Sequence, residues 1–216
     1  MNQKLTELFS YSVGIGAIIG LIRWKIVSQA YLPFILLLWL GFSNEIITTI
    51  IISKGYSNAP NNNIYDLIEA LSILWLFKKW NLFERNKNLF WYLFFLFAAT
   101  WGVENFYVSS IKVFNSYFNI LYSFIIVLMS IQMINQMILK DRAGLIRNAQ
   151  FLISVGFIAF FTYKLLIEIF WVYGLNSSHE FRANVYRIMA YINLAVNLIF
   201  ALAVLWIPRK REYILL

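Results

Sequence analysis

Residues 160–171, FFTYKLLIEIFW, place two charged side chains inside an otherwise apolar run. Lys164 and Glu168 are four residues apart, so they lie on one face of any helix through this stretch. A charged side chain at membrane depth costs about 3 kcal/mol on insertion scales, so neither is expected to face lipid. Both should point into a protein interior, and the rest of the chain has to supply that interior.

The composition of the whole chain is that of an integral membrane protein. Of its 216 residues, 61% are hydrophobic, 19% are aromatic and only 13% are charged. Several runs approach the roughly 20 apolar residues that a helix needs to cross a bilayer. These runs do not alternate between apolar and polar residues, which argues against an outer-membrane barrel. The sequence therefore predicts an all-α integral membrane protein.

Seven apolar segments separated by short connections predict one seven-helix transmembrane domain over residues 1–216. The predicted spans are residues 6–24, 31–53, 63–77, 89–108, 117–139, 151–173 and 185–207. No small-residue cleavage site follows the N-terminal residues, so the first span is expected to be retained. The third span is the shortest of the seven.

The distribution of basic residues predicts the orientation of these spans. Twelve lysines and arginines fall in the loops after the first, third and fifth spans and in the C-terminal tail, against four on the other side. The positive-inside rule then places the N-terminus outside and the C-terminus in the cytoplasm. We expect a multi-pass protein of a bacterial cytoplasmic membrane. This placement accounts for the net charge of +8, so nucleic acid is not expected as a partner.

Seven helices in this orientation resemble, in topology, the opsins, the seven-helix receptors and the small sugar and amino-acid carriers. Such a resemblance implies no function by itself. Asn63-Ile64-Tyr65 opens the third span and Asn184-Val185-Tyr186 opens the seventh, with similar apolar patterns after each. This short internal similarity is compatible with a parallel 3+1+3 repeat around the fourth span. The proline-glutamine pair that marks one such carrier family is absent.

Polar and ionisable residues recur on one face of most predicted spans, and the acidic ones fall in the outer half of the membrane. We expect them to converge on one outward-facing acidic cavity. The predicted ligand-binding residues are Asn44, Glu45, Asp66, Glu69, Glu104, Tyr122, Lys164, Glu168 and Asn193. Lys164 is expected within salt-bridge or one-water distance of a carboxylate, and its candidate partner on its own helix is Glu168. Its alternative partners across the bundle are Glu69 and Glu45, and Asp66 is expected at the rim.

The predicted cavity holds more carboxyls than basic groups, so protonation, a cation, a cationic ligand or water must complete it. Carboxylates alone suit hard cations such as Ca²⁺ or Mg²⁺. The carboxylate candidates for a metal ion are Glu45, Glu69, Glu104 and Glu168. The alternative is a structural network in which Lys164 and Glu168 form a locking ion pair. In that case Asp66 and Arg187 are hydrated at the level of the lipid headgroups.

The remaining chemistry of the chain is limited. It has one histidine, no cysteine and no glycine-rich phosphate loop, so no zinc or haem site and no catalytic motif are evident. A lysine at membrane depth raises retinal as a cofactor. Opsins carry that lysine on the seventh helix, whereas Lys164 is on the sixth span, so retinal is disfavoured.

Three functional classes are compatible with these sequence features. The first is a receptor or sensor that binds a small polar or cationic ligand from outside and signals to a separate cytoplasmic partner. The second is a small-solute or proton-coupled transporter that uses the same cavity. The third is an intramembrane enzyme that modifies lipids. The chain supplies no recognisable catalytic residues for the third class.

Overall fold

The computed structural model describes residues 9–140, 145–174 and 178–210. This part of the chain is helical apart from loops and one isolated β-bridge between Val27 and Arg209. The longer helices are α2 (Val13–Arg23), α3 (Leu32–Ser53), α4 (Ala59–Lys79), α5 (Lys87–Val103), α6 (Ser116–Lys140), α7 (Ala149–Val172) and α8 (His179–Trp206). The short ones are η1 (Gln29–Tyr31), the π-helical turn η2 (Glu104–Val108) and η3 (Leu145–Arg147). The all-α prediction is confirmed.

Five helical segments of the described chain are long and apolar enough to cross a membrane. They are Gln29–Ser53, Lys87–Val108, Ser116–Leu139, Ala149–Val172 and His179–Trp206. Each matches a predicted span, and the last begins earlier than predicted. The first predicted span lies partly outside the described residues, and its described part forms the short apolar helix α2. The third predicted span corresponds to α4, which is longer than predicted but too polar to count among the five.

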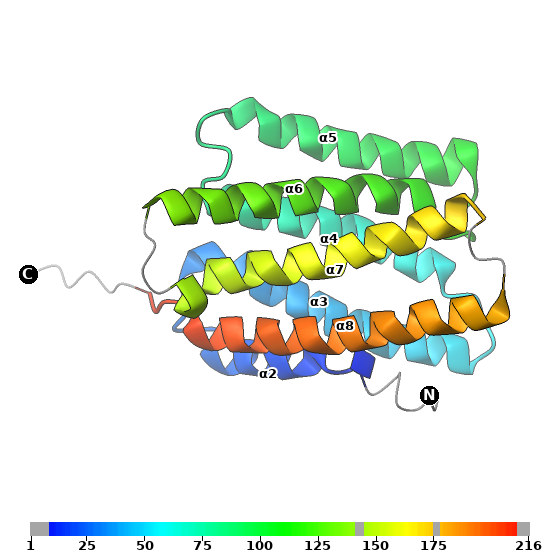
Figure 1. Cartoon of the computed structure of the whole chain (residues 1–216), viewed down its shortest axis with the longest axis horizontal. Helices are drawn as coiled ribbons and strands as arrows, with labels where there is room; N and C mark the ends of the chain where they lie inside the picture. Colours follow the sequence, from blue (N-terminus) through cyan, green and yellow to red (C-terminus); the bar gives the residue numbers. More distant parts are fainter. Residues whose placement is uncertain (1–8, 141–144, 175–177, 211–216) are drawn as a thin grey trace, which may run out of the picture.

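The helices run up and down side by side in one bundle (Figure 1). α2 packs against α3 and α8, α3 against α4, α4 against α6, α6 against α7, and α7 against α8. These contacts close a ring of six helices. α5 packs on the outside of the ring against α4 and α6, at the top of the view in Figure 1.

The two ends of the bundle differ in charge. One end, called here the basic end, is where α2, α4, α6 and α8 finish (Figure 1). The described basic residues at or next to it include Arg23, Lys25, Lys78, Lys79, Arg85, Lys87, Arg147, Arg209 and Lys210. The described basic residues in the connections at the opposite end are Lys54 and Lys112, with Arg182 in the first turn of α8.

Between the centre of the bundle and the basic end, five phenylalanines fill the interior. This aromatic floor consists of Phe34, Phe77, Phe157, Phe161 and Phe200, all buried. The ring of Phe157 lies 6.4 Å from that of Phe34, 6.1 Å from that of Phe77 and 5.5 Å from that of Phe200, at steep interplanar angles. The contacts with Phe34 and Phe200 are edge-to-face, an arrangement that is favourable for aromatic pairs. The floor therefore holds α3, α4, α7 and α8 together below the polar centre.

Gly156 allows α7 and α8 to approach closely at the aromatic floor. A Cβ built at Gly156 would collide with the ring of Phe200. By contrast, a Cβ at Gly102 of α5 would meet no other group within 4 Å. Phe200 thus occupies the space that any larger residue at position 156 would need.

Candidate functional site

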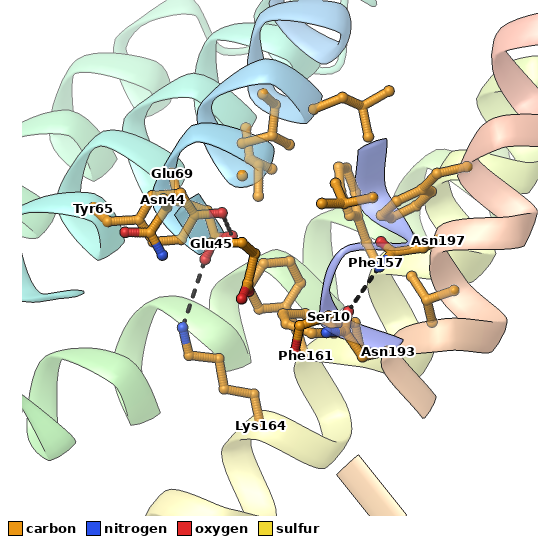
Figure 2. Close-up of a pocket in the computed structure, with 18 residues that line it drawn as sticks. Ser10, Asn44, Glu45, Tyr65, Glu69, Phe157, Phe161, Lys164, Asn193 and Asn197 are labelled. Atoms are coloured by element: carbon orange, nitrogen blue, oxygen red, sulfur yellow. Dashed lines mark hydrogen bonds and ion pairs between the residues drawn. The ribbon is translucent and has the colours of Figure 1, made fainter. Parts of the chain in front are cut away.

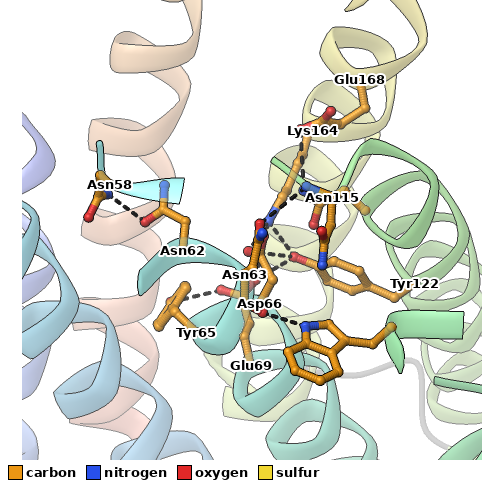
Figure 3. Close-up of polar contacts among 12 residues, drawn as sticks. Asn58, Asn62, Asn63, Tyr65, Asp66, Glu69, Asn115, Tyr122, Lys164 and Glu168 are labelled. Carbon is orange, nitrogen blue, oxygen red and sulfur yellow. Dashed lines mark hydrogen bonds and ion pairs between the residues drawn. The ribbon is translucent and has the colours of Figure 1, made fainter. Parts of the chain in front are cut away.

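The centre of the site is a buried ion-pair network between α4, α6 and α7 (Figure 3). Lys164 Nζ of α7 donates a 2.8 Å hydrogen bond to Oδ1 of Asp66 and lies 3.6 Å from Oε2 of Glu69, both on α4. Lys164 also donates to the hydroxyl of Tyr122 on α6, and this hydroxyl donates to Glu69 Oε2 at 2.8 Å. We call these four residues the Lys164 network. It joins one cation to two carboxylates, so it retains a negative charge when all three are ionised.

Local sequence explains how the network is assembled. Asp66 and Glu69 are three residues apart and therefore share one face of α4. Tyr65 donates to Oε1 of Glu69 at 2.9 Å, so both oxygens of this carboxylate accept a tyrosine hydroxyl. Asp66 is 6% exposed, Glu69 7% and Tyr122 0%. Buried charges at this depth require paired and hydrogen-bonded partners, and the network provides them.

A large cavity of about 800 Å³ lies beside the network and reaches the end of the bundle opposite the basic end. Its polar lining comprises Asn44, Glu45, Asn62, Tyr65, Asp66, Glu104, Ser109, Ser116, Tyr117, Asn119, Lys164, Glu168, Tyr186 and Asn193. Its apolar lining includes Phe114, Phe160 and Trp171. The cavity therefore has four acidic residues and one basic residue in its wall.

A small cavity of about 130 Å³ shares part of this wall and extends to the aromatic floor (Figure 2). Glu45, Lys164 and Asn193 line both cavities, and Glu69 lines only the small one. Phe157, Phe161 and Phe200 of the floor line its apolar side. The polar space thus narrows from the end of the bundle towards its centre and stops at the phenylalanines.

The acidic residues of the large cavity differ in how many partners the protein gives them. Glu104 accepts hydrogen bonds from the backbone N–H groups of Tyr117 at 3.0 Å and Phe118 at 2.6 Å, so it caps the start of α6. Glu168 accepts a long hydrogen bond of 3.4 Å from Asn119 Nδ2 and lies near the hydroxyl of Ser116. Neither donor of Glu168 carries a charge.

Glu45 is the least engaged of these acids. Its carboxylate has no hydrogen-bond or ion-pair partner among the described residues, although it is half-buried and lines both cavities. Its neighbour Asn44 accepts a 2.7 Å hydrogen bond from Asn61. Glu45, Glu104 and Glu168 all lack a cationic partner in the described chain, but only Glu104 is satisfied by two backbone N–H groups.

An asparagine scaffold holds the rim of the large cavity. The Nδ2 atom of Asn63 donates to the carbonyl groups of Ile111 at 3.0 Å and Val113 at 2.7 Å, and its Oδ1 accepts from the N–H of Asn115. Trp101 Nε1 donates to the Asn63 carbonyl at 2.7 Å. These bonds tie the connection at residues 109–115 to α4, so this part of the rim has a defined position.

Eight of the nine predicted ligand-binding residues line one or both cavities. They are Asn44, Glu45, Asp66, Glu69, Glu104, Lys164, Glu168 and Asn193. The ninth, Tyr122, is fully buried and contacts the wall through its bonds to Lys164, Glu69 and Asp66. The structure thus brings the predicted residues together around connected space.

Three expectations about this site need correction. Lys164 does pair with the expected Glu69, but its closest partner is Asp66 and not Glu168, because its side chain crosses to α4 instead of following its own helix. Asp66 is consequently inside the network and not at the rim. Among the described residues, no three histidine, aspartate or glutamate side chains lie close enough to hold a metal ion. The metal candidates Glu45, Glu69, Glu104 and Glu168 are spread along the walls, and two of them are already engaged by tyrosine hydroxyls or backbone amides.

The set of predicted residues omitted several neighbours. Tyr65 and Asn119 contact acidic groups, and Trp171 and Tyr186 supply aromatic walls. Asn119 lies one turn before Tyr122 on the polar stripe of α6, so its spacing could have indicated it. The aromatic residues carry no such signal in a chain so rich in them.

Protein-family models, characterised proteins and solved structures were compared with the chain, and none of them matches it. The function of the chain therefore has to be inferred from the geometry of the site. Acceptor groups dominate that geometry, and Lys164, the lysine of the cavity wall, already contacts two carboxylates.

Proposed function

We propose that the chain is a seven-helix membrane protein with its N-terminus outside and its C-terminus in the cytoplasm. Five helices have the required length and apolarity. α4 has 21 residues and is therefore about 30 Å long, enough to cross the hydrocarbon core. Asn63, Asp66 and Glu69 lower the hydropathy of α4. All three are buried in the bundle, so they do not expose a polar or charged group to lipid. The basic end then faces the cytoplasm.

Within this topology, the protein acts as a receptor or sensor that binds a small polar or cationic ligand from outside. The observation that carries this proposal is the large cavity, in whose wall Glu45 and Glu168 lack a cationic partner among the described residues. Intramembrane ionisable residues are costly and are candidates for function. A ligand that neutralises these two groups binds with a large electrostatic gain in this partly buried setting.

The aromatic floor favours a sensor over an open channel. The polar space of the two cavities ends at Phe157, Phe161 and Phe200, and in the described part of the chain these rings separate it from the basic end. A bound ligand can change the packing of α3, α7 and α8 through the floor, and these helices reach the cytoplasmic side. A separate cytoplasmic partner would respond to that change.

A transporter is the second candidate, and the helix contacts favour it. Exchanging α2 with α6, α3 with α7 and α4 with α8 maps the six ring contacts onto one another. This pattern is what a parallel 3+1+3 repeat would produce, with α5 as the external linker helix. In a carrier, the aromatic floor would be the closed gate on the cytoplasmic side.

Two measurements test the proposal. The purified protein is melted in detergent against inorganic cations, amines, zwitterions and sugars, because a ligand at one hundred times its dissociation constant raises stability by about 2.7 kcal/mol. Glu45→Gln should abolish the response, whereas Glu84→Gln, exposed near the basic end, should not. A parent protein that responds to no solute would contradict the proposal. Uptake of the stabilising solute into liposomes would identify a carrier instead of a receptor.

A further inference from the structure

We propose that the ligand of the large cavity carries a primary ammonium group, which binds to Glu168 and Asn119. This inference rests on the proposed function, because it assumes that the cavity binds a ligand. It narrows that ligand from small polar or cationic solutes to alkyl primary amines. The hydrogen-bonding atoms that the wall leaves without partners are the reason for this choice.

Asn119 provides the first unused acceptor. Its side chain lines the large cavity but the residue is only 3% exposed, and its Nδ2 is directed to Glu168 Oε1 at 3.4 Å. Its Oδ1 is buried and has no hydrogen-bond partner among the described residues. A buried amide oxygen without a donor is costly, so a ligand that donates to it gains that energy on binding.

Glu168 provides the second acceptor and the charge. An ionised carboxylate offers about four lone-pair sites, and the donors that the described residues direct to it, Asn119 and Ser116, are both neutral. Lys164 is one turn away on the same helix, but its ammonium group is directed to Asp66 and Glu69. The pair of Glu168 and Asn119 therefore lacks a cationic donor, and an ammonium group has three N–H donors and no acceptor.

Aromatic side chains of the same wall can contact the alkyl chain that carries such an ammonium group. Tyr117, Trp171 and Tyr186 line the cavity, and the rings of Trp171 and Tyr186 lie 6.3 Å apart in a tilted arrangement. Aromatic faces attract ammonium groups and cover their alkyl chains. An anionic or zwitterionic ligand would have to place its carboxylate among Glu45, Asp66 and Glu168, with Lys164 already satisfied. Charge thus favours an amine without an acidic group.

Binding of matched probes to the full-length protein in nanodiscs tests this inference. The probes are pentylamine, pentyltrimethylammonium, pentanol and norleucine, which share a chain of similar length. Pentylamine should bind about tenfold more tightly than pentyltrimethylammonium, because only the primary ammonium donates charge-assisted hydrogen bonds to both acceptors. Pentanol and norleucine should bind more weakly still. This comparison uses the parent protein, so it does not depend on the folding of any variant.

Two variants test whether pentylamine binds at Glu168 and Asn119. Glu168→Gln and Asn119→Leu should each reduce pentylamine affinity about tenfold, and the reduction should be smaller for pentyltrimethylammonium with Asn119→Leu. Glu180→Gln, exposed in the first turn of α8, is the matched control and should leave affinity unchanged.

The outcomes separate this inference from the function it rests on. Equal affinity for pentylamine and pentyltrimethylammonium, or unchanged pentylamine affinity in both variants, overturns the primary ammonium site. Binding of sugars, zwitterions or metal cations that is sensitive to Glu45→Gln, without binding of pentylamine, overturns the inference and leaves the proposed function intact. Failure of the parent protein to bind any solute overturns both.

Discussion

Lys164 Nζ lies 2.8 Å from Asp66 Oδ1, although 98 residues separate them in the chain. This contact connects α7 to α4 at the level where the large cavity meets the small one. Because both side chains are mostly buried, it fixes the relative position of two helices as well as the charge of the wall.

Lys164→Ala should lower the free energy of unfolding by about 3–5 kcal/mol, because it leaves two buried carboxylates without their cation. Chemical unfolding of the purified protein in mixed micelles measures the loss. Lys112→Ala, at an exposed lysine next to the cavity rim, is the control and should change stability by no more than about 0.5 kcal/mol.

A double-mutant cycle with Asp66→Asn and Lys164→Ala then isolates the pair. We expect the two losses to be strongly non-additive, because each variant removes the same interaction. Additive losses would mean that Lys164 is stabilised by other groups and that its pairing with Asp66 is not the dominant one.

Tyr122→Phe should destabilise the protein by about 1–3 kcal/mol, although the phenylalanine ring fills the same space in the core as the tyrosine ring. The change removes the hydroxyl that accepts from Lys164 and donates to Glu69, so both partners lose a buried hydrogen bond. Tyr107→Phe, at a residue that is 87% exposed, is the matched control. Equal melting temperatures for the two variants would show that the hydroxyl of Tyr122 contributes nothing.

Glu104→Ala should cost about 1–2 kcal/mol, because it removes the acceptor for two N–H groups at the start of α6. Glu104→Gln retains one carbonyl oxygen and should cost less. Since the carboxylate is occupied by backbone donors, neither variant should change ligand selectivity as strongly as Glu168→Gln. A larger effect of Glu104→Gln on binding than of Glu168→Gln would contradict this division of roles.

Gly156→Ala should destabilise the protein by about 1–3 kcal/mol, because the new methyl group overlaps the ring of Phe200. Gly102→Ala is a matched control, since both glycines lie within helices and only Gly156 has a neighbour in the way. The control should be neutral or slightly stabilising, because alanine is the better helix former. Thermal melting of both variants in detergent measures the difference, and similar melting temperatures would contradict the packing at the floor.

Much of the fold could be predicted because apolar runs of membrane length are a strong signal. The predicted spans over residues 117–139 and 151–173 agree closely with α6 and α7. α4 was predicted too short, because its first turns are rich in asparagine. Asn63 is nevertheless fully buried, since it bonds to the connection at residues 109–115, and no local pattern reveals such a distant partner.

The residues that make up the site could also be predicted from the sequence, but which of them form ion pairs and hydrogen bonds with one another could not. Helix periodicity places Lys164 and Glu168 on one face, and this spacing favours a local ion pair. A buried lysine instead finds Asp66 and Glu69, because helix packing brings α4 within reach of its long side chain. Likewise, Glu104 precedes α6 by only twelve residues, yet its role as a cap depends on the path of the η2 turn and the loop after it. Sequence spacing gives the face of a helix, whereas partners depend on tertiary packing.

The accessibility of one introduced cysteine shows whether the acidic cavity opens to the outside of the cell. The chain has no cysteine, so Asn193→Cys, at the wall shared by both cavities, is a unique label. We predict that Asn193→Cys in intact cells reacts with a membrane-impermeant cationic thiol reagent faster than with an anionic one of equal size. Ile146→Cys, exposed near the basic end, should react only after the membrane is opened. Reaction of Asn193→Cys only from the cytoplasmic side, or faster reaction with the anionic reagent, would contradict an outward-open acidic cavity.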